Sequence, residues 1–243
     1  MGGRSVQELV KQIDQPQRSS DRVERQLIKA ILEAEYPVGS PLPSERELAS
    51  RLGVGRPIVR EVIQRLERDG WLAVRKGQPA IVKDFWQHGT LNTLVNIVRN
   101  SEKITGEVIT HLLELRISLT PAYVRDAVAN QRPKVVALLS TLEQLEDRAD
   151  AFAAFDWHLQ KSMANLSPNP IYVLILNSFE QVYLKMARLY FAESARREAS
   201  RRYYHDLLEA ALAQEATSAE QLARAMMTQS LEEWQNAIAG ERR

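Results

Sequence analysis

The 243-residue chain contains no cysteine, which excludes disulfide bonds, thiolate metal sites and a cysteine nucleophile. It also lacks a stretch of about 18 uncharged apolar residues, and its first residues show no signal peptide. A charge excess is missing too, because 32 Lys and Arg balance 31 Asp and Glu to a net charge of +1. We therefore expect a cytoplasmic protein with no membrane partner. Any nucleic-acid binding must come from a local basic surface.

Signatures of catalysis are missing as well. The sequence has no serine nucleophile elbow, no phosphate-binding glycine loop and no convincing pair of catalytic carboxylates. We therefore expect no enzyme and no cofactor. A helical metal site would need Asp or His at i and i+4, but Asp156 is followed by Gln160 and the last predicted helix has no His. We expect no metal, and interpret Asp156, His158 and His205 as core polar groups.

The first 90 residues alternate helical and strand patterns. Ser20 is a good N-cap for a helix from Asp21, and "SERE" has the capping-box spacing between Ser44 and Glu47. A further helix begins near Pro57, which suits a first turn. The segments "WLAV" and "AIV" then predict two short strands joined by "RKGQP". Helix, helix, turn, helix and hairpin is the order of a winged helix-turn-helix.

Beyond residue 90 the strand signals vanish and helical periods take over. Helices are predicted near 88–101, 105–129, 133–148, 150–166, 170–192, 199–214 and 218–239. The predicted fold is mainly α, a winged helix-turn-helix followed by an all-helical ligand-binding bundle. Its predicted parts are an N-terminal extension (1–19), the DNA-binding domain (20–86), a linker helix (87–104) and the ligand-binding and dimerisation-supporting domain (105–243).

Basic residues gather on the predicted DNA-binding domain. Arg56, Arg60 and Gln64 are four residues apart and share the polar side of one helix. Arg60 has no acidic neighbour three or four residues away, so a solvated face with ion pairs explains it poorly. In a helix-turn-helix, the start of the second helix contacts base edges in the major groove. The set predicted to contact DNA is Arg46, Arg56, Arg60 and, at the tip of the wing, Arg75, Lys76 and Gly77.

The segments "LPSERELA" and "VREVIQRLERDGWL" resemble the N-terminal domain of GntR-family transcriptional regulators. The resemblance implies a homodimer on a short palindromic operator, with DNA contacts from the basic residues just named. Gly55 and Pro57 stand where hydroxyl residues are common in the family. Hydroxyl contacts to phosphate are therefore missing there, which leaves the preferred operator open.

The predicted bundle contains polar side chains on otherwise apolar helices. Arg116 lies in "HLLELRISLT", and a buried arginine needs a partner or an anionic ligand. Tyr183 and Tyr190 are seven residues apart and share a helix face, as do Ser230 and Trp234 four residues apart. Taken alone, these patterns fit core packing at least as well as a pocket.

The segment "RADAFAAFDWHLQKSMANLSPNPIYVLILN", with "ARLYF" and "SLEEW", resembles the ligand domain of the acyl-CoA-responsive, FadR-like subgroup of the GntR family. That resemblance implies release from DNA by long-chain fatty acyl-CoA, with Arg116, Tyr190, Ser230 and Trp234 at the ligand. Met226 and Met227 depart from the subgroup's pattern, which leaves the acyl chain length open.

Two alternatives stay open from sequence. One is a regulator of the same architecture that responds to a small carboxylate, with or without a metal. The other is a helical enzyme or lipid carrier with an accessory DNA-binding domain, although nothing visible activates a water or a nucleophile.

Overall fold

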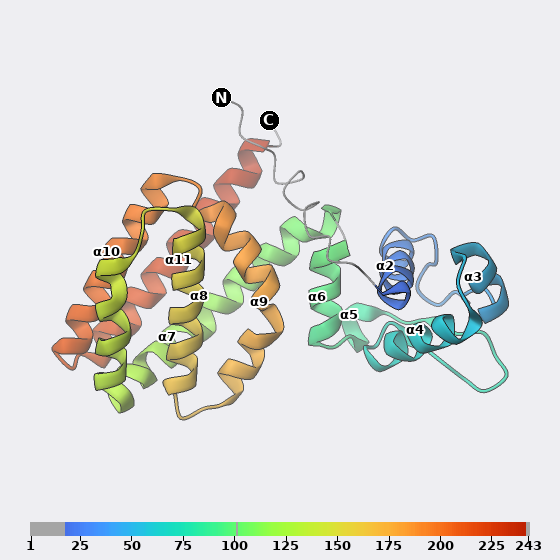
Figure 1. Ribbon diagram of the computed structural model, residues 1–243, viewed down its shortest axis with the longest axis horizontal. Helices are drawn as coiled ribbons and strands as arrows, with labels where there is room; N and C mark the ends of the chain where they lie inside the picture. Colours follow the sequence, from blue (N-terminus) through green and yellow to red (C-terminus); the bar gives the residue numbers. More distant parts are fainter. Residues whose placement is uncertain (1–17, 101, 242–243) are drawn as a thin grey trace. The chain divides into compact units, whose positions relative to one another are not determined.

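The computed structural model describes residues 18–100 and 102–241, and most of them are helical (Figure 1). The chain forms two compact units that meet between Thr105 and Gly106. The predicted class, a winged helix-turn-helix followed by an all-helical domain, is confirmed. Residues 1–17 of the predicted N-terminal extension lie outside the described residues. The predicted domain boundaries stay predictions.

The N-terminal unit begins with α2 (Ser19–Leu32), α3 (Glu45–Leu52) and α4 (Arg56–Arg68). The predicted capping box opens α3, because Glu47 N–H donates to Ser44 Oγ at 3.3 Å and Ser44 N–H donates to Glu47 Oε2 at 2.9 Å. Pro57 lies in the first turn of α4 as expected. The predicted cap at Ser20 is wrong: α2 starts two residues earlier, with Arg18 at the N-cap position, and Ser20 is buried within the helix.

A small wing follows α4. Strands β1 (Leu72–Ala73) and β2 (Ile81–Val82) pair antiparallel, with Leu72 opposite Val82 and Ala73 opposite Ile81. The turn between them carries the basic residues of the predicted DNA contact and stays exposed. The pairing is too short to form a face of its own, so the wing depends on packing against α4.

Two short helices close this unit, α5 (Phe85–His88) and α6 (Leu91–Asn100). The sequence patterns did not predict α5, and α6 packs against α2. Gly70, between α4 and the wing, has φ +87°, and a Cβ there would lie 2.0 Å from the His88 carbonyl oxygen. The chain therefore passes this point only because residue 70 has no side chain.

The core of the N-terminal unit lies where α2, α3 and α4 meet. Val23, Val59 and Leu66 are fully buried, and Trp71 anchors the wing with no exposed surface, its ring 4.8 Å from that of Phe85. One side of α4 is therefore fixed by apolar packing. The opposite side is left for polar side chains, as the sequence periodicity predicted.

The C-terminal unit contains α7 (Glu102–Leu139) apart from its first four residues, which precede the boundary. It continues with η1 (Ser140–Gln144), α8 (Ala149–Leu166), α9 (Ile171–Tyr190), α10 (Ser194–Leu212) and α11 (Ala216–Glu241). Gln131 breaks α7 with non-helical angles (φ −136°, ψ 34°), in the gap expected between two predicted helices. The prediction that the second of them runs to residue 148 is wrong. Ser140 and Thr141 turn their hydroxyls back onto carbonyls of the preceding turn, at 2.8 and 2.7 Å, where the α-helix ends.

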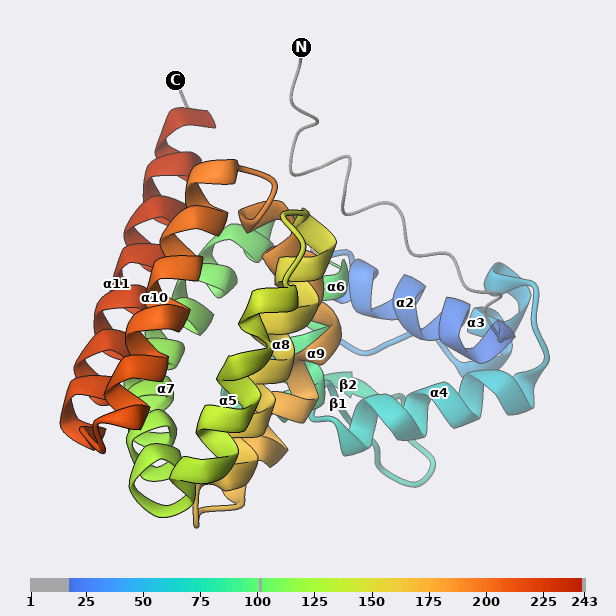
Figure 2. The ribbon, with the colours of Figure 1, turned by 60° about the vertical axis from the view of Figure 1, so that its left-hand side comes forward.

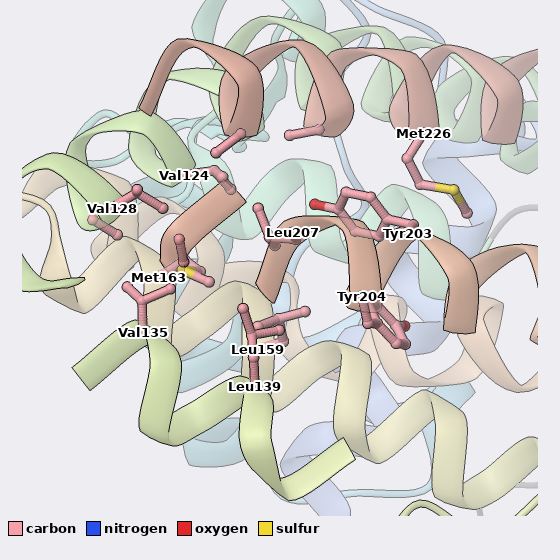
Figure 3. Packing of buried hydrophobic residues seen from close by; sticks show 14 of the residues in the cluster. Val124, Val128, Val135, Leu139, Leu159, Met163, Tyr203, Tyr204, Leu207 and Met226 are labelled. Atoms are coloured by element: carbon pink, nitrogen blue, oxygen red, sulfur yellow. The ribbon is translucent and has the colours of Figure 1, made fainter. Parts of the chain in front are cut away.

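The bundle packs α8 against α9 and α10 against α11 (Figure 2). Its core combines aliphatic side chains from α7 and α8 with Tyr203, Tyr204 and Leu207 from α10 and Met226 from α11 (Figure 3). None of the helices in the described ranges has the length and apolar composition that a membrane span requires.

Candidate functional site

The predicted DNA-contacting residues lie at the helix starts and at the tip of the wing. Arg56 is the first residue of α4, and Arg60 follows one turn later. Arg46 lies in the first turn of α3. These three and the three wing residues are all exposed. Gly77 has φ +77° with nothing within 4 Å of an added Cβ, so the tip of the wing is free to approach a partner closely.

Arg60 has an acidic partner, which the spacing along its own helix did not predict. Its Nε donates to Glu45 Oε1 at 3.2 Å and its Nη2 donates to Glu45 Oε2 at 2.9 Å. The hydrogen bond from Arg60 is the main cause that lowers the pKa of Glu45, and Arg56 adds to it. The absence of an acidic neighbour along α4 itself holds, and the carboxylate that pairs with Arg60 comes from α3.

The pairing leaves part of the Arg60 guanidinium unused. Glu45 occupies the edge formed by Nε and Nη2, while Nη1 and the second N–H of Nη2 point elsewhere. A guanine presents O6 and N7 as two adjacent acceptors in the major groove, and a two-pronged donor matches them. Glu45 therefore holds Arg60 in one orientation without consuming all of its hydrogen-bonding capacity.

Another arginine of α4 is structural. Arg65 contacts Asp21 at 3.3 Å and Glu24 at 3.1 Å, both on α2, as well as Glu61 at 2.5 Å on its own helix. Since three carboxylates surround it, Arg65 fastens α4 to α2. The polar side of α4 is thus divided between arginines at its start that face outward and one further along that is consumed by the fold.

Within the bundle, Arg116 lies beside Tyr183. Its Nη2 donates to the Tyr183 hydroxyl at 3.3 Å, and its Cζ lies 4.9 Å from the centre of that ring. Burial is the largest single influence on the pKa of Arg116 and acts to lower it, but the surrounding groups, among them the Asp156 carboxylate, together raise it. A charged guanidinium is therefore held inside the helical unit, as the sequence predicted for this position.

Asp156 forms the centre of a buried hydrogen-bond network. The Tyr183 hydroxyl donates to its Oδ2, the Tyr204 hydroxyl donates to its Oδ1 at 2.9 Å, and Gln160 donates to Oδ1 at 3.5 Å. Gln160 in turn accepts from the Tyr123 hydroxyl at 2.6 Å. Burial raises the pKa of Tyr183 and of Tyr204 well above the ordinary value, so both remain neutral donors.

Of the three residues predicted to be polar groups of the core, one is buried and two are exposed. Asp156 is buried and hydrogen-bonded as expected. His158 and His205 are exposed, so the prediction that they are core groups is wrong. Residues 18–100 and 102–241 include no cluster of three or more His, Cys, Asp or Glu side chains suited to a metal ion. The expectation of a protein that needs no metal stays a prediction.

The other three predicted ligand residues gather where α9 and α11 meet the start of α10. The Arg196 guanidinium lies 5.0 Å from the centre of the Tyr190 ring and 3.0 Å from Glu233 on α11. Ser230 and Trp234 are on the same helix as Glu233, and the Ser230 hydroxyl lies close enough to Tyr190 to oppose the rise of its pKa. Burial still raises the pKa of Tyr190 to about 12. Tyr190 and Ser230 are therefore neighbours, and Trp234 follows Ser230 by one turn of α11, so these three residues are treated as one group.

Arg116 lies apart from that group, in the Asp156 network. The two are connected electrostatically, because Asp156 acts on both Arg116 and Tyr190. Sequence reasoning did not find Arg196, although its position just after the end of α9 is a signal that could have suggested it. The Tyr190 hydroxyl and the Trp234 indole Nε1 are buried and have no hydrogen-bond partner among the described residues.

Comparison with known proteins agrees with both halves of this description. Residues 19–82 match the family of bacterial regulatory proteins named gntR, and residues 83–239 match the FadR C-terminal domain. The chain belongs to the gntR family and carries a FadR-type C-terminal domain. It is therefore a DNA-binding transcriptional regulator by family, and the alternative of an enzyme or lipid carrier is set aside.

Curated relatives extend over nearly the whole chain. The fatty acid metabolism regulator protein of Shewanella pealeana is 38% identical over 88% of this chain and 89% of its own length. The protein of the same name from Klebsiella pneumoniae is 38% identical over 76% of this chain and 77% of its own. The solved structure of Lar, which controls the expression of the Listeria monocytogenes agr system, covers 92% of this chain and 99% of its own at 16% identity and a TM-score of 0.61. Lar supports the fold alone.

Proposed function

We propose that this FadR-type regulator controls fatty acid metabolism as a homodimer that binds a palindromic operator and is released by long-chain fatty acyl-CoA. One observation carries the proposal: the FadR-type domain holds a charged Arg116 and unpartnered polar groups inside an otherwise apolar bundle. Relatives named fatty acid metabolism regulators match nearly the full chain. The protein would act in the bacterial cytoplasm, where its operator is.

The DNA half of the proposal depends on the exposed start of α4. Arg56 and Arg60 lie in its first two turns, which is where a recognition helix meets base edges. Arg46 at the start of α3 and the tip of the wing supply phosphate or minor-groove contacts. A single winged helix covers only a few base pairs, so two copies related by a two-fold axis would read the two halves of an inverted repeat.

The effector half depends on the mixed chemistry of the bundle. Arg116 suits a phosphate or a carbonyl oxygen, while Tyr190 and Trp234 present aromatic walls with polar edges. The surrounding core is aliphatic, and each buried methylene of an acyl chain contributes about 0.8 kcal/mol. An acyl-CoA combines the anionic, polar and hydrocarbon parts that these surfaces match.

Release from DNA requires that the effector prefers one arrangement of the dimer. If acyl-CoA binds best when the two recognition helices are wrongly spaced for one face of DNA, it shifts the population away from the operator-binding state. The acyl-CoA and the DNA do not have to touch each other, because each favours a different spacing of the two recognition helices. The coupling is reciprocal, so operator DNA would weaken acyl-CoA binding by the same factor.

A binding titration tests this proposal. An inverted repeat would first be selected from a random duplex pool, then labelled and titrated with protein by fluorescence anisotropy. We expect palmitoyl-CoA to weaken operator binding at least about tenfold, a coupling of about 1.4 kcal/mol, whereas free CoA has little effect. Sedimentation should show two protomers per duplex. Operator affinity that is the same with and without palmitoyl-CoA would contradict the release mechanism.

Arg116 gives a second candidate effector some support. A guanidinium also binds a carboxylate through two parallel hydrogen bonds, so a small carboxylate, with or without a metal, stays an alternative. Native mass spectrometry of the purified protein separates the two, since a bound acyl-CoA and a bound small acid differ greatly in mass. Stoichiometric zinc, nickel or manganese in a metal analysis would favour the alternative.

A further inference from the structure

Three polar residues of α10 share one face of that helix. Arg196, Ser200 and Tyr203 are spaced i, i+4 and i+7, which places their side chains on one side. Ser200 is 1% exposed and Tyr203 is 6% exposed, so this side of α10 faces the interior of the bundle. Sequence reasoning did not select Ser200 or Tyr203, and neither belongs to the ligand set implied by family resemblance.

The hydroxyls of Ser200 and Tyr203 have no hydrogen-bond partner among the described residues. Comparable hydroxyls nearby are satisfied: Tyr204 donates to Asp156 at 2.9 Å, and Ser230 donates to the carbonyl of Met226 at 2.9 Å. A buried hydroxyl without a partner costs about 1–3 kcal/mol. Two of them on one helix face indicate that a partner from outside the chain completes them.

The surroundings of Tyr203 identify the chemistry of that partner. Figure 3 shows the ring among the core side chains, with its hydroxyl on the Leu207 side and Met226 on the other. Burial raises the pKa of Tyr203 far above the ordinary value, and the Asp156 carboxylate adds to the rise more than Arg116 opposes it. The phenol is therefore a neutral donor, which suits a carbonyl oxygen.

Further unpartnered groups come from the adjoining helices. The Tyr190 hydroxyl on α9 and the Trp234 indole Nε1 on α11 also lack partners among the described residues. Arg196, one turn before Ser200, stacks on the Tyr190 ring. Unpartnered polar groups therefore come from three helices of the bundle, and a hydrocarbon chain could satisfy none of them.

We infer that the Ser200 and Tyr203 hydroxyls bind the carbonyl and amide groups of the polar arm of acyl-CoA, next to its thioester, while the hydrocarbon lies against the aliphatic core. This inference rests on the proposed function, since it assigns two contacts to the same effector. A hydroxyl can donate to a carbonyl oxygen and accept from an amide N–H. Both groups alternate along that arm.

Removing a single oxygen atom tests the inference. Tyr203→Phe should weaken palmitoyl-CoA binding by roughly two- to tenfold, the worth of one hydrogen bond, in calorimetric titrations below the critical micelle concentration. In the absence of effector, the unfolding midpoint of Tyr203→Phe should equal or exceed that of the unchanged protein, because an unsatisfied hydroxyl has been removed. Ser200→Ala should show the same pair of effects.

Two further tyrosine variants serve as controls. Tyr204→Phe removes a hydroxyl that is already bonded to Asp156, so its unfolding midpoint without effector should fall. Tyr36→Phe, in the N-terminal unit, should leave palmitoyl-CoA binding unchanged.

The outcomes separate this inference from the proposed function. An unchanged dissociation constant in Tyr203→Phe and Ser200→Ala would overturn the inference alone. A lowered midpoint in Tyr203→Phe without effector would also overturn it, because its hydroxyl would then have a partner within the protein. If the unchanged protein does not bind palmitoyl-CoA, the proposed function fails and this inference fails with it.

Discussion

The two units of this chain place their polar side chains in opposite ways. In the N-terminal unit, Arg46, Arg56 and Arg60 lie on exposed helix starts, and the core beneath them is apolar. In the C-terminal unit, Asp156 is buried and Arg116 is partly buried in the same network. The first unit displays its cations to solvent, whereas the second shields its charged groups within the protein. The same residue types therefore carry different energetic weight in the two units.

The largest effect is expected at the centre of the buried network. Asp156→Ala removes the acceptor of two tyrosine hydroxyls and the Gln160 amide, and leaves Arg116 without its carboxylate. We expect the free energy of unfolding to fall by about 3 kcal/mol, because buried donors are left unsatisfied. Chemical denaturation followed by circular dichroism measures it.

Asp150→Ala is the matched control for that variant. Asp150 is also on α8 and pairs with Arg188, but both side chains are largely exposed. A surface pair of this kind contributes about 0–1 kcal/mol. If the free energy of unfolding fell equally in the two variants, the burial of Asp156 would add nothing to stability.

The next largest effect is expected on operator affinity, from the exposed Arg60. Arg60→Ala should weaken operator binding by roughly 1–3 kcal/mol if its guanidinium contacts a base, and should leave palmitoyl-CoA binding intact. Lys29→Ala, an exposed basic residue of α2 outside the predicted contact set, should change operator affinity little. An Arg60→Ala protein that binds the operator as well as the Lys29→Ala protein would remove Arg60 from the interface.

A variant at Arg65 tests whether this arginine of α4 stabilises the fold rather than contacting DNA. Arg65→Ala leaves Asp21, Glu24 and Glu61 without their shared cation. We expect a loss of stability of about 1 kcal/mol, since the group is only partly shielded from solvent. Operator affinity measured well below the unfolding midpoint should be unchanged. Weaker operator binding with normal stability would place Arg65 at the DNA instead.

The smallest expected effect is on how well the protein distinguishes its operator from unrelated DNA. Glu45→Gln removes a negative charge near the DNA and one of the two acceptors that orient Arg60. Binding to unrelated DNA should therefore rise while the advantage of the operator falls, by about 0.5–1.5 kcal/mol in the ratio. Competition titrations with operator and unrelated duplex measure both. A preserved ratio would mean that Arg60 finds its orientation without Glu45.

The comparison of the two units also explains what the sequence could predict. The capping box at Ser44 and Glu47, and Pro57 at a helix start, are local signals, and the structure confirms them. The pairing of Arg60 with Glu45 crosses from one helix to another, so no periodicity within a helix contains it. Helix ends were predicted least well, as at Leu139, where hydroxyl groups compete for backbone carbonyls.

The interior of the bundle was predicted only in part. Arg116 and Asp156 stood out because charged residues are rare on apolar helices, and both lie in the network. His158 and His205 were misplaced, because one residue of rotation decides whether a side chain faces the core or solvent. Ser200 and Tyr203 carried no signal of their own. Their importance depends on the absence of partners, which a sequence does not show.

Gly70 and Gly77 differ in how well the structure would tolerate their substitution. Both have positive φ, which disfavours any other residue, but only at Gly70 does the His88 carbonyl also occupy the space of a Cβ. A substitution at 77 would strain the tip of the wing and leave its root in place. A substitution at 70 would force α5 away from the end of α4 and with it the Phe85 ring that packs on Trp71.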